Sequence, residues 1–274
     1  MVCYNNIMRE KIIINADDLG LKLCANRSIE ELMRLGAVSS ASIMVNRSGE
    51  CFWDAVRIAK EFKSRASFGL HLDLDRFFLF DESGHYGVDE NDIIENYCSI
   101  INARGDEIKY SVIAQIDKLR GCGIEVSHLD GHHFAHLFME SLAIILPIMS
   151  ARSISAMRYN SGFYLSQERR ALSEGLIARY GIRVPDGFGD LWALDLQSET
   201  PHLRDERIFR RASVSRGEAV VRGEAVSQSV EIMAHTQIAG SGCEEWAVAQ
   251  HNYLRNNIER LRCFDLTSFK KKSV

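Results

Sequence analysis

The sequence lacks the features that would point to a membrane, to the secretory route or to nucleic acid. It has 274 residues and is 46% apolar, but it contains no run of about 18 apolar residues, so we expect no membrane span. A short apolar run near the N-terminus ends in Asp17 and Asp18 rather than in small residues, which argues against a signal peptide. The formal net charge of −4 argues against nucleic acid or an anionic membrane as a partner.

The cysteines are scattered, and none of them form the C-x-x-C pairs that are typical of structural zinc sites. There are seven, an odd number, and an odd and widely spaced set does not fit a disulfide framework. We therefore expect reduced thiols and a cytoplasmic protein. The composition leaves open whether the chain forms a homo-oligomer.

The chain also lacks a linker rich in proline or glycine, a low-complexity segment and an internal repeat of fixed period. We therefore expect a single domain over residues 1–274, with a core at 11–262. A length of about 250 residues is normal for one α/β barrel.

The sequence does contain a regular alternation of short apolar runs with amphipathic stretches. Residues 11–15 are β-branched and continuous, as in a buried parallel strand, and residues 26–36 have helical spacing and end in Gly36. The alternation predicts further strands at 37–46, 66–74, 124–130, 153–160, 182–185 and 229–235, helices at 51–63, 106–120, 137–150, 166–180 and 244–262, and a partly helical stretch at 203–223. About seven such units predict an α/β fold with a parallel, TIM-barrel-like sheet and helices outside.

Polar residues gather where several predicted strands end, which in parallel barrels is the edge that carries the active site. These residues are Asn15, Asp17, Asp18, His71, Asp73, His128, Asp130, His132, His133, His136, Arg158 and His235. Four of the nine histidines lie within residues 127–138, beside Asp130. Because imidazoles are costly to bury together without a metal or carboxylates, this cluster favours a metal site.

Each of these residues also fits a structural role. Asp17 and Asp18 could cap a helix, His71 could be a core histidine, and Arg158 could be an ion-pair partner. The i, i+4 spacing of His132 and His136 would place both on one helix face. Taken together, one carboxylate and two imidazoles would make a mononuclear metal site with open positions for water and substrate. A second carboxylate beside the metal could act as general base.

Four segments resemble the hallmark segments of the YdjC-like carbohydrate deacetylases, a family that includes chitooligosaccharide deacetylases. They are IIINADDLG (12–20), GLHLDL (69–74), SHLDGHHFAH (127–136) and EIMAH (231–235), in the order of the family. GAVSSASIMVN (36–46) and ISAMRYN (154–160) resemble two of its other strands, so the resemblance covers most of residues 11–262. It implies a seven-stranded, TIM-barrel-like fold and metal-dependent removal of an acetyl group from an N-acetylated amino sugar or oligosaccharide.

By motif position, the resemblance implies that Asp18, His71 and His132 bind one divalent metal ion, magnesium or zinc. It implies that Asp17 is the base and that His235 protonates the leaving amine or steadies the oxyanion. The residues expected to support the ligands or to contact substrate are His128, Asp130, His136, Arg158 and Trp192. Trp192, together with Phe188, would form a stacking wall for a sugar ring or a part of the core.

Four positions depart from the family's pattern. Gly131 replaces a serine, Phe134 replaces the middle histidine, Thr236 replaces the proline after His235, and Leu19 stands where phenylalanine is common. The three expected ligands are retained, so these changes bear on ligand orientation and on substrate choice. Two other functions stay open: a phosphoesterase, which would normally use two metals, and a non-catalytic sugar-binding protein on the same fold.

Overall fold

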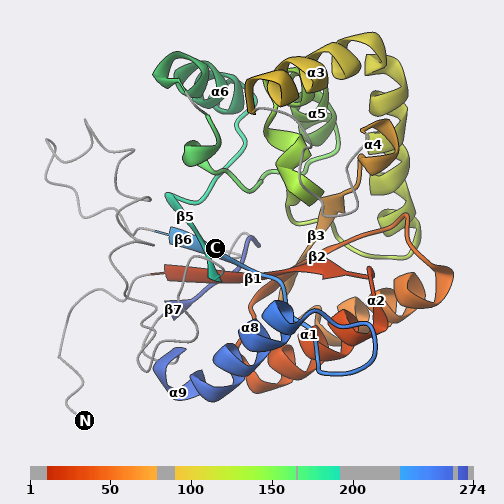
Figure 1. Cartoon of the computed structure of the whole chain (residues 1–274), viewed down its shortest axis with the longest axis vertical. Coiled ribbons are helices and arrows are strands. Elements are labelled where there is room, and N and C mark those ends of the chain that lie inside the picture. The colour runs from red at the N-terminus through yellow and green to blue at the C-terminus, as the bar shows by residue number, and fades with distance from the viewer. Residues whose placement is uncertain (1–10, 79–89, 165, 192–228, 262–264, 271–274) are drawn as a thin grey trace, which may run out of the picture.

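The computed structural model of the chain describes residues 11–78, 90–164, 166–191, 229–261 and 265–270 (Figure 1). Its strands are β1 (Lys11–Leu19), β2 (Ser40–Ile43), β3 (Ser67–Leu72), β4 (Leu129–Gly131), β5 (Gly187–Asp190), β6 (Ser229–Ala234) and β7 (Asp265–Leu266). Its α-helices are α1 (Leu23–Leu35), α2 (Gly49–Phe62), α3 (Glu90–Ala103), α4 (Gly105–Gly121), α5 (Met139–Ala151), α6 (Gln167–Arg179), α8 (Glu245–Asn256) and α9 (Ile258–Leu261). Short 3-10 helices are η1 (Asp75–Phe77), η2 (His132–Leu137) and η3 (Ser161–Phe163).

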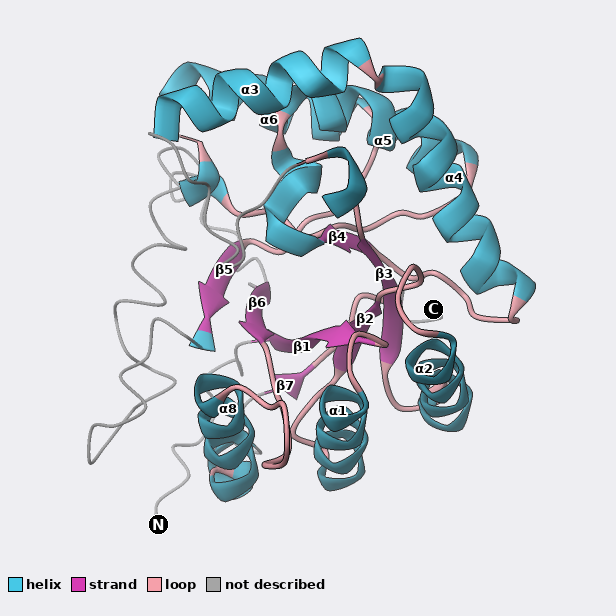
Figure 2. Ribbon diagram, turned by 45° about the vertical axis from the view of Figure 1, so that its right-hand side comes forward, coloured by secondary structure: helices cyan, strands magenta, loops and turns pink. Residues whose placement is uncertain are grey.

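All described strand pairs are parallel, and the strands form one curled sheet. Six strands follow one another in the order β4-β3-β2-β1-β6-β5, and β7 pairs with β1. Figure 2 shows the sheet curving like half a barrel, with α1, α2 and α8 on one side and α3 to α6 on the other. The predicted α/β, TIM-barrel-like fold with helices outside is confirmed, and the number of seven strands holds only approximately.

Two predicted strands are present only as single backbone bridges. Met157, within the predicted strand 153–160, pairs with Leu129 of β4, and Ala156 pairs with Arg183 in the predicted strand 182–185. The bridges continue the parallel pairing from β4 toward β5. These bridges lie between Ser153, which has a φ of 55° after α5, and η3, which begins at Ser161.

Other boundaries differ from the predictions. The predicted strand 124–130 pairs regularly only at its end, in β4, and the predicted helix 244–262 divides into α8 and α9. α3 and β7 were not predicted. The predicted helical stretch 203–223 lies outside the described residues.

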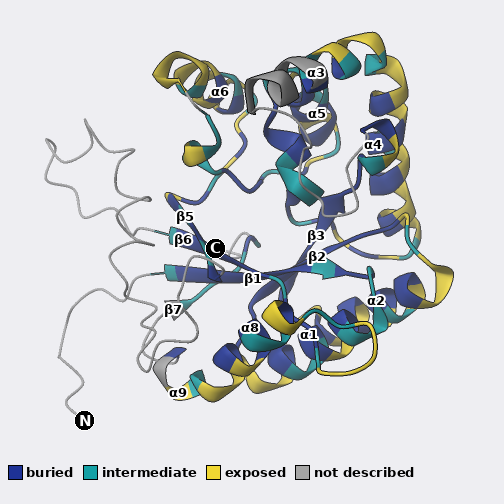
Figure 3. Ribbon diagram, viewed as in Figure 1, coloured by how far each residue is buried: buried dark blue, intermediate teal, exposed yellow. Residues whose placement is uncertain are grey.

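The core lies between the sheet and the inner faces of the helices. Ile12 and Ile14 of β1 are fully buried, and so are Ile29 and Leu32 on one face of α1. Each such side chain contributes roughly 1.5–3 kcal/mol by leaving water. Figure 3 shows the strands and inner helix faces buried and the outer helix faces exposed. Among the helices in the described ranges, none is long and apolar enough to cross a membrane.

Candidate functional site

The end of β1 turns two consecutive aspartates toward the same interior site. Successive residues of a strand normally point to opposite faces of the sheet. Here the register between β1 and β2 shifts between Ala16 and Leu19, and Asp18 has a φ of 65°. A left-handed backbone at a non-glycine residue costs about 1–3 kcal/mol. The bulge therefore allows Asp17 and Asp18 to serve one site from neighbouring positions.

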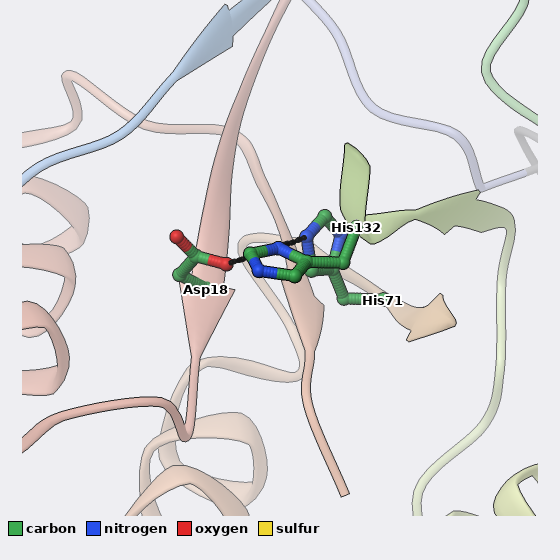
Figure 4. Close-up of side chains that lie close together, drawn as sticks. All are labelled: Asp18, His71 and His132. Atoms are coloured by element: carbon green, nitrogen blue, oxygen red, sulfur yellow. Dashed lines mark hydrogen bonds and ion pairs between the residues drawn. The ribbon is translucent and has the colours of Figure 1, made fainter. Parts of the chain in front are cut away.

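Asp18, His71 and His132 bring three metal-ligating atoms to one point, from β1, β3 and the start of η2 (Figure 4). Asp18 Oδ1 lies 3.3 Å from His71 Nε2 and 3.3 Å from His132 Nδ1. The two imidazole nitrogens are also 3.3 Å apart, so the three atoms form an equilateral triangle. Ligands that lie about 2.0–2.1 Å from a tetrahedral ion are separated by about 3.3–3.4 Å, which is the size of this triangle.

The charges at this triangle fit a divalent cation. Asp18 Oδ1 is buried and accepts no hydrogen bond of regular geometry; its polar neighbours are the two imidazole nitrogens 3.3 Å away, and a cation between the three atoms would compensate its charge. Burial would raise the pKa of Asp18, but His132 and His71 hold that pKa well below its ordinary value, so the carboxyl is ionised. Burial would lower the pKa of His71, but Asp130 and then Asp18 raise it well above its ordinary value. A metal ion at His71 Nε2 would therefore have to displace a proton.

Two other groups of described side chains also have metal-ligating spacing, but arginines already occupy them. The first is Asp75, His132 and His133, where Arg47 Nη2 lies 2.6 Å from Asp75 Oδ2. The second is Asp17, His71 and Asp130, where Arg158 contacts both carboxylates. Among the three groups, the triangle of Asp18, His71 and His132 is therefore the one best suited to a cation.

A buried carboxylate supports His71 from behind. Asp130 Oδ1 lies 2.8 Å from His71 Nδ1, which leaves Nε2 directed at the triangle. Asn15 Nδ2 donates to Asp130 Oδ2 at 3.2 Å and to Asp17 Oδ1 at 2.8 Å. A carboxylate behind a ligating histidine fixes the ring and its tautomer. Asp130 therefore restrains the ring of His71 with its Nε2 toward Asp18 and His132.

Arg158 is almost completely buried and joins the acidic side chains of three strands. Its Nη1 and Nη2 donate to the two oxygens of Asp17, each at 2.6 Å. Nη2 also lies 3.1 Å from Asp130 Oδ2, and Nε donates to Glu231 Oε1 at 2.7 Å. Arginine is suited to this position because its planar donors match carboxylates in pairs.

His235 follows β6 and faces the two aspartates of β1. Its Nε2 lies 3.8 Å from Asp17 Oδ2 and 4.0 Å from Asp18 Oδ2. Its backbone N–H donates to Gln250 Oε1 at 2.8 Å, and its ring meets that of Trp246 edge-on at 5.6 Å. The side chain is 23% exposed, so a molecule from solvent can reach it.

The turn after β4 separates His132 from His136, and the prediction that they share a helix face is wrong. Within η2, His133 and Phe134 have left-handed φ values of 52° and 55°. These residues interrupt the helical geometry on which the i, i+4 relation depends. His132 therefore reaches Asp18, whereas His136 is turned into the interior.

His136 is fully buried and packs against Gly131. Its Nε2 lies 3.3 Å from the backbone oxygen of Arg158, and burial lowers the pKa of His136 to about 3. A Cβ on residue 131 would lie 2.7 Å from His136 Nδ1. Glycine at position 131, where the family usually has serine, is therefore matched to the packing of His136.

His128 points to another part of the interior. Its Nδ1 lies 2.9 Å from Ser127 Oγ, and its ring stacks on Phe269 at 4.0 Å. Burial lowers the pKa of His128 to about 4, so the ring is neutral. These contacts join His128 to the C-terminal segment rather than to one of the three ligating atoms. Trp192 lies outside the described residues.

Sequence reasoning missed Glu231, which reaches Arg158 from β6. The signal was present, because a glutamate in the apolar run SVEIMA is unusual in a strand that is buried on both faces. Met233 lies two residues after Glu231 and therefore on the same face of β6. Its sulfur accepts a hydrogen bond from Arg158 Nη1 at 3.4 Å.

Comparisons with known proteins agree with this architecture. Among curated proteins, the carbohydrate deacetylase of Brevibacillus brevis is 27% identical over 248 residues, which cover 83% of this chain and 95% of that protein. Carbohydrate deacetylase 1 of Listeria innocua is 34% identical over 128 residues, which cover 45% of this chain and 51% of that protein. A solved structure from Enterococcus faecalis V583, named for cellobiose-phosphate cleavage, has a TM-score of 0.61 at 21% identity and covers 95% of this chain and 98% of that one.

The match to a protein family extends over nearly the whole described sheet. The structural likeness at 21% identity supports the fold alone. The family model of YdjC-like proteins, however, matches residues 11–262, a range that contains β1 to β6 and every side chain of the triangle and of the Arg158 network. The chain therefore belongs to the YdjC-like protein family.

Proposed function

We propose that this chain is a metal-dependent carbohydrate deacetylase that removes the acetyl group from an N-acetylated amino sugar or oligosaccharide. The observation that carries the proposal is the triangle of Asp18, His71 and His132 beside Asp17, which Arg158 holds by both oxygens. The names of the relatives from Brevibacillus brevis and Listeria innocua, both carbohydrate deacetylases, support the same activity.

Asp18, His71 and His132 would hold one divalent ion, and their spacing favours zinc. Adjacent ligands about 2.0–2.1 Å from an octahedral Mg²⁺ are about 2.9 Å apart, whereas those of a tetrahedral Zn²⁺ are about 3.3–3.4 Å apart. The observed separations are 3.3 Å. Two imidazoles and one carboxylate also suit zinc better than magnesium. We therefore propose zinc as the resident ion, with magnesium as the alternative.

Asp17 would act as the base in amide hydrolysis. The amide resists hydrolysis because its carbonyl is a weak electrophile and its amine leaves poorly; a divalent ion at the site would polarise the carbonyl and activate water. Asp17 would accept the proton of the attacking water. The Arg158 fork, bonded to both oxygens of Asp17, holds the carboxylate in one orientation.

His235 would act as the acid. Its Nε2 lies within 4.0 Å of both Asp17 and Asp18, and the side chain is accessible to solvent. A protonated imidazole at this point would donate a proton to the amide nitrogen as the C–N bond breaks. The hydrogen bond from its backbone to Gln250 and the ring contact with Trp246 restrain its position.

The described residues favour deacetylation over a two-metal phosphoesterase. A second ion would need Asp75 and His133 together with His132, which already belongs to the first triangle. Arg47 lies 2.6 Å from the Asp75 carboxylate and would repel that ion. A single site with a nearby base and acid is sufficient for amide hydrolysis.

The proposal is tested by metal analysis and product release on the purified protein. We expect about one equivalent of zinc per chain and release of acetate from one or more members of a panel of N-acetylated amino sugars and their oligomers. The matched control is Asp18→Asn, which should lose both metal and acetate release. Phosphate release from phosphorylated sugars would instead support the phosphoesterase. Binding of sugar by metal-loaded protein without any acetate would support a non-catalytic sugar-binding protein.

A further inference from the structure

Glu231 lies at the centre of the interior network but does not touch the metal triangle. It is in the middle of β6 and is fully buried. Its Oε1 accepts a hydrogen bond from Arg158 Nε at 2.7 Å, while its Oε2 is buried without a hydrogen-bond partner. Its neighbours across the sheet, Ile13 in β1 and Phe188 in β5, carry no charge. Its hydrogen bond into the site is the one to Arg158.

The hydrogen bond from Nε determines how Arg158 presents its other donors. The guanidinium is planar, and its donors have a fixed geometry. Once Glu231 holds Nε, the plane is defined, and Nη1 and Nη2 point at the two oxygens of Asp17, each at 2.6 Å. Without an acceptor at Nε, the guanidinium could rotate toward Asp130, which already contacts Nη2 at 3.1 Å. The Asp17 carboxylate would then lose one of its two hydrogen bonds.

The network contains more acid than base. Three buried carboxyl groups, those of Asp17, Asp130 and Glu231, face the single guanidinium of Arg158. An excess of buried negative charge is unfavourable, and one carboxyl group relieves it by binding a proton. Burial raises the pKa of Glu231 to about 7 in spite of Arg158, and the charges of Asp130 and Asp17 add to the rise. Asp130 has a second cationic neighbour, because His71 Nδ1 lies 2.8 Å from its Oδ1, whereas Arg158 is the charged group that Glu231 contacts.

We propose that Glu231 is a positioning residue of this site, which orients Arg158 and thereby the base Asp17, and that this role does not require its negative charge. The proposal rests on the proposed function for the role of Asp17. The carbonyl oxygen of a neutral acid still accepts the Nε–H of Arg158, so the hydrogen bond does not need the negative charge. The shape of the Glu231 side chain is then essential, and its charge is dispensable.

Two substitutions separate shape from charge. Glu231→Gln keeps an acceptor for Arg158 Nε and is neutral at every pH, so we expect kcat for acetate release within a fewfold of wild type. Glu231→Leu removes the acceptor and should lower kcat by about 10–100-fold, as for other residues that orient a site from behind. KM should be unchanged in both variants because Glu231 does not reach the substrate. The matched control is Val230→Ala, which weakens the same strand without touching Arg158.

A second measurement follows Arg158 directly and does not depend on activity. In protein with isotope-labelled arginine, the Nε–H resonance of Arg158 is assigned by its absence in Arg158→Lys. In wild type we expect a slowly exchanging proton whose shift titrates with a midpoint at about 7. In Glu231→Gln the resonance should persist without that titration, and in Glu231→Leu it should exchange rapidly with water.

The outcomes distinguish the two proposals. Wild-type kcat in a folded Glu231→Leu variant would overturn the positioning role. A loss of kcat in Glu231→Gln as large as that in Glu231→Leu would show that the negative charge is required, and would overturn the second part of the proposal. If Glu231→Leu does not fold, Glu231→Gln and the resonance decide the question. If wild-type protein releases no acetate, the proposed function fails. The positioning role is then judged from the resonance alone: equal protection of the Arg158 Nε–H in wild type and in Glu231→Leu would show that Glu231 does not orient Arg158.

Discussion

The chain carries two networks of arginine and carboxylates, one on its surface and one inside the curled sheet. On the surface, Arg57 of α2 contacts Glu30 of α1 at 2.6 Å and Asp54 at 2.9 Å, and its side chain is 50% exposed. Inside, Arg158 contacts Asp17 at 2.6 Å and Glu231 at 2.7 Å, and its side chain is 1% exposed. The distances are nearly equal, so access to water is the main difference between the two networks.

Water decides what each network contributes. An exposed ion pair is worth about 0–1 kcal/mol because solvent already stabilises both charges. Breaking a buried pair costs about 3–5 kcal/mol because the remaining charge is left buried, without a partner and without solvation by water. The surface network can therefore change freely, whereas the interior network constrains every residue that touches it. The interior is also where the positions of Asp17 and His71 are set.

The largest effect is expected where a charge is removed from the site itself. Asp18→Asn should lose bound metal and turnover together, whereas Asp17→Asn should keep the metal and lose about 10²–10⁴-fold in turnover, the usual contribution of a general base. Elemental analysis and acetate release on both variants test this pair. The control is Asp54→Asn in the surface network, which should leave both quantities unchanged. Wild-type turnover of Asp17→Asn would exclude Asp17 as the base.

The next effect concerns stability. Arg158→Met leaves the buried carboxyl groups of Asp17, Asp130 and Glu231 without their cation, so the free energy of unfolding should fall by about 3–5 kcal/mol. Urea denaturation monitored by circular dichroism measures the change. If the free energy of unfolding fell by less in Arg158→Met than in Arg57→Met, water would have to reach the interior network. The two networks would then not differ in their access to water.

A smaller effect concerns the pH dependence of the free energy of unfolding, which we expect from the interior network through Glu231. The folded-state pKa of Glu231 is raised to about 7 from an ordinary value of 4.5, so its stabilising contribution is complete below about pH 4.5 and is lost as pH rises through about 7. The difference in unfolding free energy between wild type and Glu231→Gln should therefore shift by on the order of 3 kcal/mol across this range, in favour of the glutamine variant at high pH. Denaturation curves at several pH values test it, and a constant difference would contradict the raised pKa.

The smallest effect is expected on the surface. Arg57→Met should change the free energy of unfolding by about 0–1 kcal/mol, and added salt should reduce even that change. The same denaturation assay as for Arg158→Met makes the two arginines directly comparable. A cost above about 2 kcal/mol would show that the surface network acts as a cooperative unit rather than as separate exposed pairs.

Much of the fold was predictable from local patterns. The continuous apolar run that contains Ile12 to Ile14 predicted β1, and the spacing of Ile29 and Leu32 predicted α1, because burial on one face leaves a period in the sequence. The strand predicted at 153–160 is reduced to isolated bridges between the left-handed turn at Ser153 and the start of η3. Such turns depend on backbone angles that residue type only weakly determines.

The candidate site was predictable in membership but not in arrangement. The strand-end rule placed Asp18, His71 and His132 among twelve polar residues at one edge, the family resemblance singled out these three as ligands, and the structure brings the same three together. The i, i+4 spacing did not predict the left-handed turn at His133, and so it wrongly placed His136 on the same helix face as His132. Sequence reasoning also did not identify Glu231. This residue occupies a buried position of a predicted strand, and it differs from the apolar residues around it only in carrying a carboxyl group.

The sequence by itself determined the parallel α/β architecture, the family and the set of polar residues at one edge of the sheet, since each depends on local period or on motif order. The tertiary structure alone decided which of these residues meet. Arg158 and Asp17 are 141 positions apart, and Arg158 and Glu231 are 73 apart. No local preference encodes such contacts, because they arise only when the curled sheet carries distant strand ends to one interior point.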